Sequence, residues 1–224
     1  MGAPGRRASD VVLDGPRRGA DRAVLLAHGA GADLDAPPLA ATAAALAEAG
    51  IPSMRFRYPY RAAGRRAPDR PAVLMEATRA AAADLARRVR LPPERLVLGG
   101  RSMGGRYCSL VAADPTDPVA CLGLLLLGYP LHPAGRPEKR RVEHFPRLEV
   151  PVLFVSGTRD ALADRELLER ETAAVPGPVT FHWLETADHG FRPLKASGLT
   201  FDGTVAGAAA AATDWVTSLP VPGP

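Results

Sequence analysis

The sequence predicts an α/β fold in which a mostly parallel sheet is covered by helices on both faces. Short apolar runs at 23–27, 96–99, 121–127 and 152–156 have the length of buried strands, and segments with helical potential separate them. The run at 121–127 is apolar throughout rather than alternating, as expected of a central parallel strand. With 224 residues, the chain is long enough for one full core.

The first half of the chain alternates strands with helices. An alanine-rich segment predicts a helix that Gly50 ends, and apolar residues at helical spacing after Pro71 predict a second one. The expected elements are a short edge strand at 11–13, a strand at 23–27, a helix at 37–49, a strand at 53–57, a loop at 58–69 and a helix at 71–89.

The second half continues the alternation. We expect a strand at 96–99, a helix ending near 114–115, strands at 121–127 and 152–156, a helix near 164–174, a strand at 179–184 and a helix near 204–219. Residues 1–9 are small and polar and are predicted to be a disordered tail. The predicted organisation is therefore a single domain at 10–219, followed by a tail at 220–224.

A serine flanked by glycines follows the apolar run at 96–99. Residues 100–104 read Gly-Arg-Ser-Met-Gly, and a segment with helical potential comes next. A G-x-S-x-G sequence between a strand and a helix is typical of a nucleophilic serine on a sharp turn, where the glycines let the backbone pass close to its neighbours. The sequence therefore predicts Ser102 as a nucleophile, against the alternative of a solvent-facing serine in a glycine turn.

Three further motifs stand where the chain leaves a predicted strand. His28-Gly29-Ala30-Gly31 follows the strand at 23–27 and is related to the HGGG element that supplies an oxyanion donor. Asp160 comes shortly after the strand at 152–156, and His189 lies in the loop after the last strand. The order serine, acid, histidine is that of the α/β hydrolases.

With these motifs, written HGAG, GGRSMGGR, SGTRDAL and ADHGF, the chain resembles the α/β-hydrolase superfamily from about Ala23 to about Trp215. Through the long motif at 100–106 it is similar to a small lidless branch, related to dienelactone hydrolases, that includes a testis-expressed protein and a subunit of a chromatin acetyltransferase complex. Ser102 replaces the cysteine of true dienelactone hydrolases, which argues against their reaction. The resemblance implies a three-layer α/β-hydrolase fold with a minimal cap or none.

The candidate catalytic residues receive the roles of a serine triad. Ser102 would attack a carbonyl, and His189 would take its proton because an imidazole titrates near neutral pH. Asp160 would orient His189 and stabilise its charged form. The backbone N–H groups of Ala30 and Met103 would form the oxyanion hole.

Other residues compete for these roles. Asp164 or Asp188 could be the acid, and Asp160 could instead be a carboxylate at a helix N-terminus. We predict that His28 is a structural imidazole that hydrogen-bonds the oxyanion loop. The remaining two candidates, predicted to be structural or surface histidines, are His144 and His182.

Two loops are expected to build the substrate pocket, at 58–66 and 129–147, and they suggest Tyr60, Arg66 and His132 as substrate-binding residues. The second loop is short, rich in proline and charged, which predicts an open site without a lid. We hypothesise that arginines of these loops, namely Arg65, Arg66 and the basic run at 139–141, attract an anionic acyl substrate. Solvated loop charges are the alternative.

Composition excludes several other classes of function. The net charge is +4, but arginines are dispersed among acids and no RNA-binding or zinc signature is present, so no nucleic-acid partner is predicted. Cys108 and Cys121 lie in apolar contexts without metal-ligand spacing, which predicts reduced core residues and no metal or other cofactor. No apolar segment reaches the roughly 18 residues of a membrane span, so a cytoplasmic location without membrane attachment is expected.

The predicted function is that of a serine hydrolase that cleaves a small ester or thioester through an acyl-enzyme intermediate. The alternative is a noncatalytic interaction module on the same fold, because a fold does not determine a function. The sequence leaves the acyl group, the leaving group and the oligomeric state open.

Overall fold

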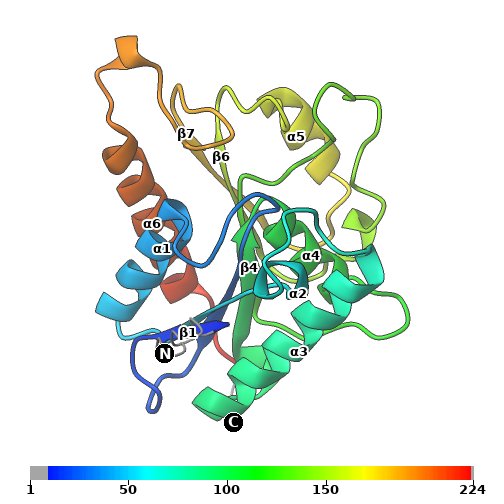
Figure 1. Cartoon of the computed structure of the whole chain (residues 1–224), viewed down its shortest axis with the longest axis vertical. Helices are drawn as coiled ribbons and strands as arrows, with labels where there is room; N and C mark the ends of the chain where they lie inside the picture. Colours follow the sequence, from blue (N-terminus) through cyan, green and yellow to red (C-terminus); the bar gives the residue numbers. More distant parts are fainter. Residues whose placement is uncertain (1–9, 223–224) are drawn as a thin grey trace, which may run out of the picture.

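The computed structural model describes residues 10–222 (Figure 1). These residues form a seven-stranded sheet in the order β1-β3-β2-β4-β5-β6-β7. Only β1 at the edge pairs antiparallel, so the predicted mostly parallel sheet is confirmed. The strands are β1 (Val11–Asp14), β2 (Ala23–Ala27), β3 (Ser53–Phe56), β4 (Leu96–Arg101), β5 (Gly123–Leu127), β6 (Val152–Gly157) and β7 (Val179–Leu184). Residues 1–9, which were predicted to be disordered, lie outside the described residues, and so do residues 223–224 of the predicted tail at 220–224.

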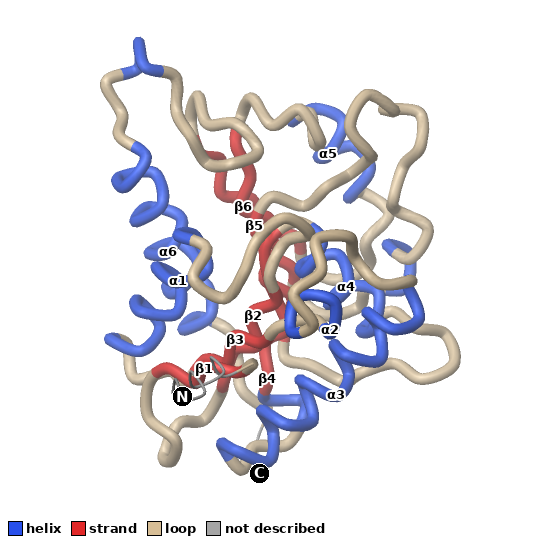
Figure 2. Tube along the Cα trace, viewed as in Figure 1, coloured by secondary structure: helices blue, strands red, loops and turns tan. Residues whose placement is uncertain are grey.

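Helices cover both faces of the sheet, as predicted, and give three layers (Figure 2). On one face α1 (Pro37–Glu48) packs beside α6 (Phe201–Ser218), and on the other α3 (Pro71–Val89) packs beside α4 (Met103–Ala112). The shorter α5 (Arg165–Thr172) joins the second face through Leu168.

Burial on both faces explains why the central strands are apolar throughout. In β2, Leu25 belongs to the core under α3 and α4, whereas Val24 and Leu26 belong to the core under α1 and α6. Alternate side chains of a strand point to opposite faces, so a strand covered on both sides needs apolar residues at every position.

Several element boundaries differ from the predictions by one to three residues, and one short α-helix was not predicted. The loop predicted at 58–69 contains a one-turn helix, α2 (Pro59–Ala62), which begins at a proline whose fixed φ suits a first helical position. β4 runs two residues further than predicted, through Gly100 and Arg101. β5 begins at Gly123, so Cys121 precedes it, and both Cys108 and Cys121 are buried free thiols.

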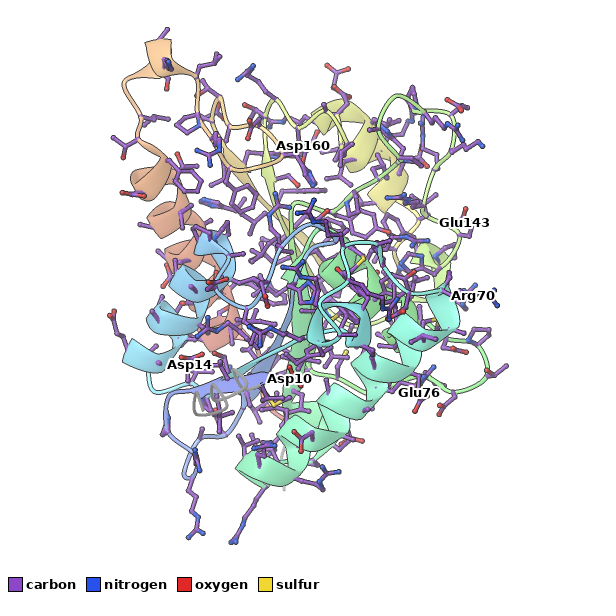
Figure 3. All side chains as sticks on the ribbon, viewed as in Figure 1. Asp10, Asp14, Arg70, Glu76, Glu143 and Asp160 are labelled. Atoms are coloured by element: carbon purple, nitrogen blue, oxygen red, sulfur yellow. The ribbon has the colours of Figure 1, made fainter. Side chains whose placement is uncertain are left out.

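The parallel strands end at one edge of the sheet, and the loops that leave this edge carry the predicted site residues. Asp160 lies in this region, near the top of the view in Figure 3. Among residues 10–222, no helix is both long and apolar enough to cross a membrane.

Candidate active site

Ser102 occupies the sharp turn between β4 and α4. Its backbone has φ 51° and ψ −115°, a region that non-glycine residues rarely adopt and that costs on the order of 1–3 kcal/mol. The Ser102 N–H donates to the Leu127 carbonyl at 2.9 Å, and the Ser102 carbonyl accepts from the Arg106 N–H at 3.1 Å. The sheet on one side and the helix on the other thus hold the strained turn.

Gly104 allows α4 to begin against the end of β2. A Cβ added to Gly104 would overlap the backbone of Ala27 and the carbonyl oxygen of His28. The glycine is therefore required by the close approach of two elements, which brings the turn at Ser102 beside the loop that follows β2.

The structure brings Ser102, His189 and Asp160 into one hydrogen-bonded line. His189 Nε2 lies 3.0 Å from Ser102 Oγ, and His189 Nδ1 lies 2.8 Å from Asp160 Oδ2 and 3.0 Å from Oδ1. The Asp160 side chain has no exposed surface, while that of His189 is 27% exposed. The imidazole thus stands between a buried carboxylate and the hydroxyl.

These contacts determine the tautomer of His189. A carboxylate can only accept, so the proton lies on Nδ1 and Nε2 is left as the acceptor for the Ser102 hydroxyl. Asp160 Oδ1 also accepts from the Leu162 N–H at 2.8 Å, which fixes the carboxylate in its turn. The arrangement has the geometry required for proton transfer from a serine to a histidine.

The loops that carry Asp160 and His189 are hydrogen-bonded to each other. The Arg159 N–H donates to the Ala187 carbonyl at 2.9 Å, and the Thr186 N–H donates to Thr158 Oγ1 at 2.8 Å. Because β6 and β7 are paired neighbours, the loops that follow them start side by side, and these hydrogen bonds fix their relative positions.

The competing acids have other partners. Asp164 caps α5, where its Oδ1 accepts from the Leu167 N–H at 3.0 Å. Asp188 Oδ1 accepts from the N–H groups of Gly190 and Arg192 and so shapes the turn of the histidine loop.

His28 is the first residue of the HGAG loop that follows β2, and it is fully buried. Its Nε2 accepts from the Tyr58 N–H at 3.1 Å, so its Nδ1 carries the proton and donates to the Gly29 carbonyl at 2.8 Å. Burial lowers the pKa of His28 and keeps the ring neutral. His28 thus hydrogen-bonds the HGAG loop, as expected of a structural imidazole.

Ala30 and Met103 line the same cavity as Ser102. Within residues 10–222, neither backbone N–H donates a hydrogen bond to another group. The Ala30 carbonyl is held by the Tyr60 hydroxyl at 2.8 Å, and burial raises the pKa of Tyr60 to about 12, so that it remains a donor. Two amides beside the hydroxyl are thus available to a ligand.

The cavity next to Ser102 has a volume of about 470 Å³, within the range of small-molecule pockets. Of the three predicted substrate-binding residues, His132 lines it and is 6% exposed. Tyr60 is instead buried, with its hydroxyl bonded to the Ala30 carbonyl, and Arg66 is exposed and does not line the cavity. Apolar side chains and prolines form much of the wall, including Pro68, Pro71, Leu74, Met103, Tyr107, Pro130, Pro133 and Leu162.

Two arginines line the cavity, of which the sequence hypothesis included Arg141 but missed Arg106. Arg106 lies one helical turn after Ser102, and this i,i+4 spacing was a signal that could have identified it. Arg141 is one residue of the basic run at 139–141, but its neighbour Arg140 faces Glu171 at 3.5 Å. Arg65 pairs with Asp69 at 2.6 Å rather than lining the cavity.

A family model described as an alpha/beta hydrolase domain matches residues 20–217. The chain belongs to the α/β-hydrolase family. This confirms the resemblance predicted from the motifs, and the three-layer sheet is the fold expected for the family.

Solved structures of other α/β hydrolases share this fold. An α/β serine hydrolase homologue from Coxiella burnetii has a TM-score of 0.71 and 18% identity, with 91% of this chain and 89% of that chain covered. Est1E from Butyrivibrio proteoclasticus, solved with ferulic acid bound, has a TM-score of 0.71 and 14% identity, with coverage of 93% and 94%. An α/β serine hydrolase without a lid from Xanthomonas campestris has a TM-score of 0.62 and 20% identity, with coverage of 94% and 90%.

This α/β hydrolase has no helical cap in its described part. Between β5 and β6 the chain forms a loop with a single 3₁₀ turn, Phe145–Arg147. The predicted lidless architecture is therefore confirmed. In the same described range, no group of three or more His, Cys, Asp or Glu side chains is arranged to hold a metal ion.

Proposed function

We propose that this α/β hydrolase is a serine hydrolase that cleaves small esters or thioesters through an acyl-enzyme intermediate. The observation that carries the proposal is the line from Asp160 through His189 to Ser102, beside the backbone amides of Ala30 and Met103. This arrangement supplies a base for the hydroxyl and donors for a developing oxyanion.

In the first half-reaction, Ser102 Oγ bonds to the substrate carbonyl carbon as its proton moves to His189 Nε2. The electron pair of the carbonyl moves to its oxygen, which the N–H groups of Ala30 and Met103 stabilise. When the tetrahedral intermediate collapses, the bond to the alcohol or thiol breaks, and the leaving group takes the proton from His189.

In the second half-reaction, water attacks the acyl-enzyme and gives its proton to His189 Nε2. Collapse of the new intermediate breaks the bond to Ser102 Oγ, which recovers the proton while the carboxylic acid leaves. Asp160 stays ionised throughout, because it stabilises the charged imidazole without taking its proton.

Hydrolysis of 4-nitrophenyl and thioester substrates of graded acyl length tests the proposal. We expect Ser102→Ala and His189→Ala each to lower kcat by on the order of 10⁶-fold, because the triad works as a unit. Ser218→Ala, at the exposed end of α6, and His182→Ala, in β7, are matched controls that retain activity. Wild-type rates in Ser102→Ala would contradict the mechanism, and a wild-type protein inert toward the whole panel would favour the noncatalytic interaction module.

A further inference from the structure

Two arginines face the cavity from backbone that is held in place. Arg106 lies in the first turn of α4, where its N–H donates to the Ser102 carbonyl. Arg141 lies in the loop after β5, where its N–H donates to the Leu131 carbonyl at 2.9 Å and its carbonyl accepts from the Tyr129 hydroxyl at 2.6 Å. Both positions are therefore set by the fold rather than by a free loop.

Neither guanidinium has a carboxylate partner among residues 10–222. Arg106 Nε is buried without a hydrogen bond, and the Arg106 guanidinium carbon lies 5.7 Å from the centre of the Tyr107 ring. No ion pair is formed by Arg141 in this range, whereas its neighbour Arg140 and the nearby Arg65 both have acidic partners. Two unpaired charges in a concave site are costly unless a ligand of opposite charge binds there.

The other charged and titratable groups near the cavity, among residues 10–222, form no ion pair with Arg106 or Arg141. Asp69 lines the cavity, but Arg65 binds its Oδ1 at 2.6 Å. Glu143 is exposed, at the outer edge of the view in Figure 3, and its charge acts on Arg141 in the direction that raises the pKa without cancelling the net fall. His144 is buried, and burial together with Arg106 and Arg147 lowers its pKa to about 3, so it is neutral at physiological pH.

The two arginines also act on each other. The pKa of Arg141 is lowered first by burial and then by the positive charge of Arg106. An anion bound between the two side chains would relieve this repulsion. A carboxylate offers two acceptor oxygens in a plane, which matches the flat donor fork of a guanidinium group.

We propose that Arg106 and Arg141 bind a free carboxylate of the substrate, so that this enzyme cleaves esters or thioesters that carry a second, ionised acid group. The inference rests on the proposed serine hydrolase function and names its substrate class. The sequence suggested an anionic substrate bound by Arg65, Arg66 and the run at 139–141. The structure-based proposal keeps the anionic substrate but assigns its binding to Arg106 and to Arg141 of that run.

Two series of substrates test the inference. In the first, 4-nitrophenyl monoesters of succinic, glutaric and adipic acids are compared with the corresponding carboxamides, which have the same shape without the charge. In the second, 4-carboxyphenyl butyrate is compared with 4-carbamoylphenyl butyrate, which places the charge on the leaving group. The quantity measured is the ratio of kcat/KM for the acid to kcat/KM for its amide.

We expect a ratio on the order of 10 to 100 in at least one series, because charge-assisted hydrogen bonds are stronger than neutral ones. The ratio should fall close to one in Arg106→Gln and in Arg141→Gln, whereas the exposed Arg136→Gln in the same loop should keep it. Circular dichroism checks that each variant folds, and either folded variant is sufficient for the test.

Labelling of the wild-type protein with an uncharged fluorophosphonate distinguishes a failure of the carboxylate-site proposal from a failure of the serine hydrolase proposal. If Ser102 is labelled but the ratio is close to one in both series, the carboxylate site is wrong and the serine hydrolase remains. A high ratio that persists in the folded arginine variants would also overturn the inference. If the folded wild type neither reacts with the probe nor cleaves any ester, both proposals fall.

Discussion

Arg101, the residue before Ser102, is 8% exposed and connects three parts of the site. Its Nη1 donates to the carbonyls of Leu127 at 3.1 Å and Gly128 at 3.3 Å, and its guanidinium carbon lies 4.7 Å from the centre of the Phe191 ring. Burial lowers the pKa of Arg101 to about 10, against the opposing effects of Asp160 and Asp188. Arg101 thus joins β4 to the end of β5 and to the histidine loop.

We expect Arg101→Met to lower kcat by on the order of 10- to 100-fold with little change in KM, because small displacements of a catalytic group have costs of this size. Methionine keeps much of the side-chain volume but loses the donors and the contact with Phe191. Steady-state kinetics measure the effect. The control is Arg95→Met, because Arg95 directly precedes β4 at the end opposite the site and its side chain donates to the exposed Pro222 carbonyl. A rise in KM at constant kcat would show that Arg101 serves substrate binding instead.

The residues that the sequence could identify are those with a local signature. Ser102, Asp160 and His189 each follow a recognisable strand or motif, so their convergence could be expected from the shared edge of a parallel sheet. Arg141 and Tyr60 lack such a signature. Their positions depend on how two loops fold over the site, which involves hydrogen bonds such as Tyr129 Oη to the Arg141 carbonyl.

Among the elements, the contact of α4 with the end of β2 is decisive for the site. Gly104 permits this contact, and the loop after β2 carries the candidate oxyanion amide of Ala30. Any side chain at position 104 would separate the two elements and move Ser102 away from that amide.

We expect Gly104→Ala to lower the free energy of unfolding by at least about 1–3 kcal/mol, because its methyl group would meet backbone atoms that cannot move alone. Gly207→Ala is the matched control, since Gly207 lies within α6 and its Cβ would meet nothing within 4 Å. That control should raise the free energy of unfolding by about 0.5–1 kcal/mol. Urea unfolding measures both, and equal effects of the two substitutions would contradict the packing argument.

The elements themselves were largely predictable, and their errors have local causes. β2, α3 and β7 begin and end as the apolar patterns predicted. Gly100 hid the last two residues of β4, because glycine has no side chain to contribute to a strand pattern although its backbone pairs normally. The one-turn α2 is too short for a helical period to be visible in the sequence.

For the whole molecule, two buried neutral histidines make the stability depend on pH. Burial lowers the pKa of both His28 and His144 from the ordinary value of 6.5, in His144 to about 3 with a contribution from Arg106 and Arg147. Below pH 6.5 the unfolded chain binds protons that the folded protein does not. The free energy of unfolding therefore falls as pH decreases from 6.5 toward 3.

Each histidine that remains neutral in the folded protein adds up to about 1.4 kcal/mol per pH unit to the slope of the free energy of unfolding against pH in this window. We expect His144→Gln to reduce the slope of the free energy of unfolding between pH 6.5 and 4.5, whatever its effect on stability at neutral pH. Urea unfolding at several pH values gives the slope. The same slope in wild type and variant would show that His144 is not held neutral by the fold.

At this scale the sequence predicted the class of fold but not the order of its strands. Alternating strands and helices imply a parallel sheet. The placement of β2 between β3 and β4 depends on long-range packing, which local sequence patterns do not reveal. The family resemblance supplied the three-layer architecture, because its motifs span most of the chain, but it was not used to predict the strand order.

Mass spectrometry of the protein after reaction with a fluorophosphonate tests the nucleophile most directly. We predict one covalent adduct, located on Ser102 by peptide mapping, absent in Ser102→Ala and formed far more slowly in His189→Ala. A folded wild-type protein that remains unmodified, or that carries the adduct on another residue while Ser102 stays free, would contradict the assignment of Ser102 as the nucleophile.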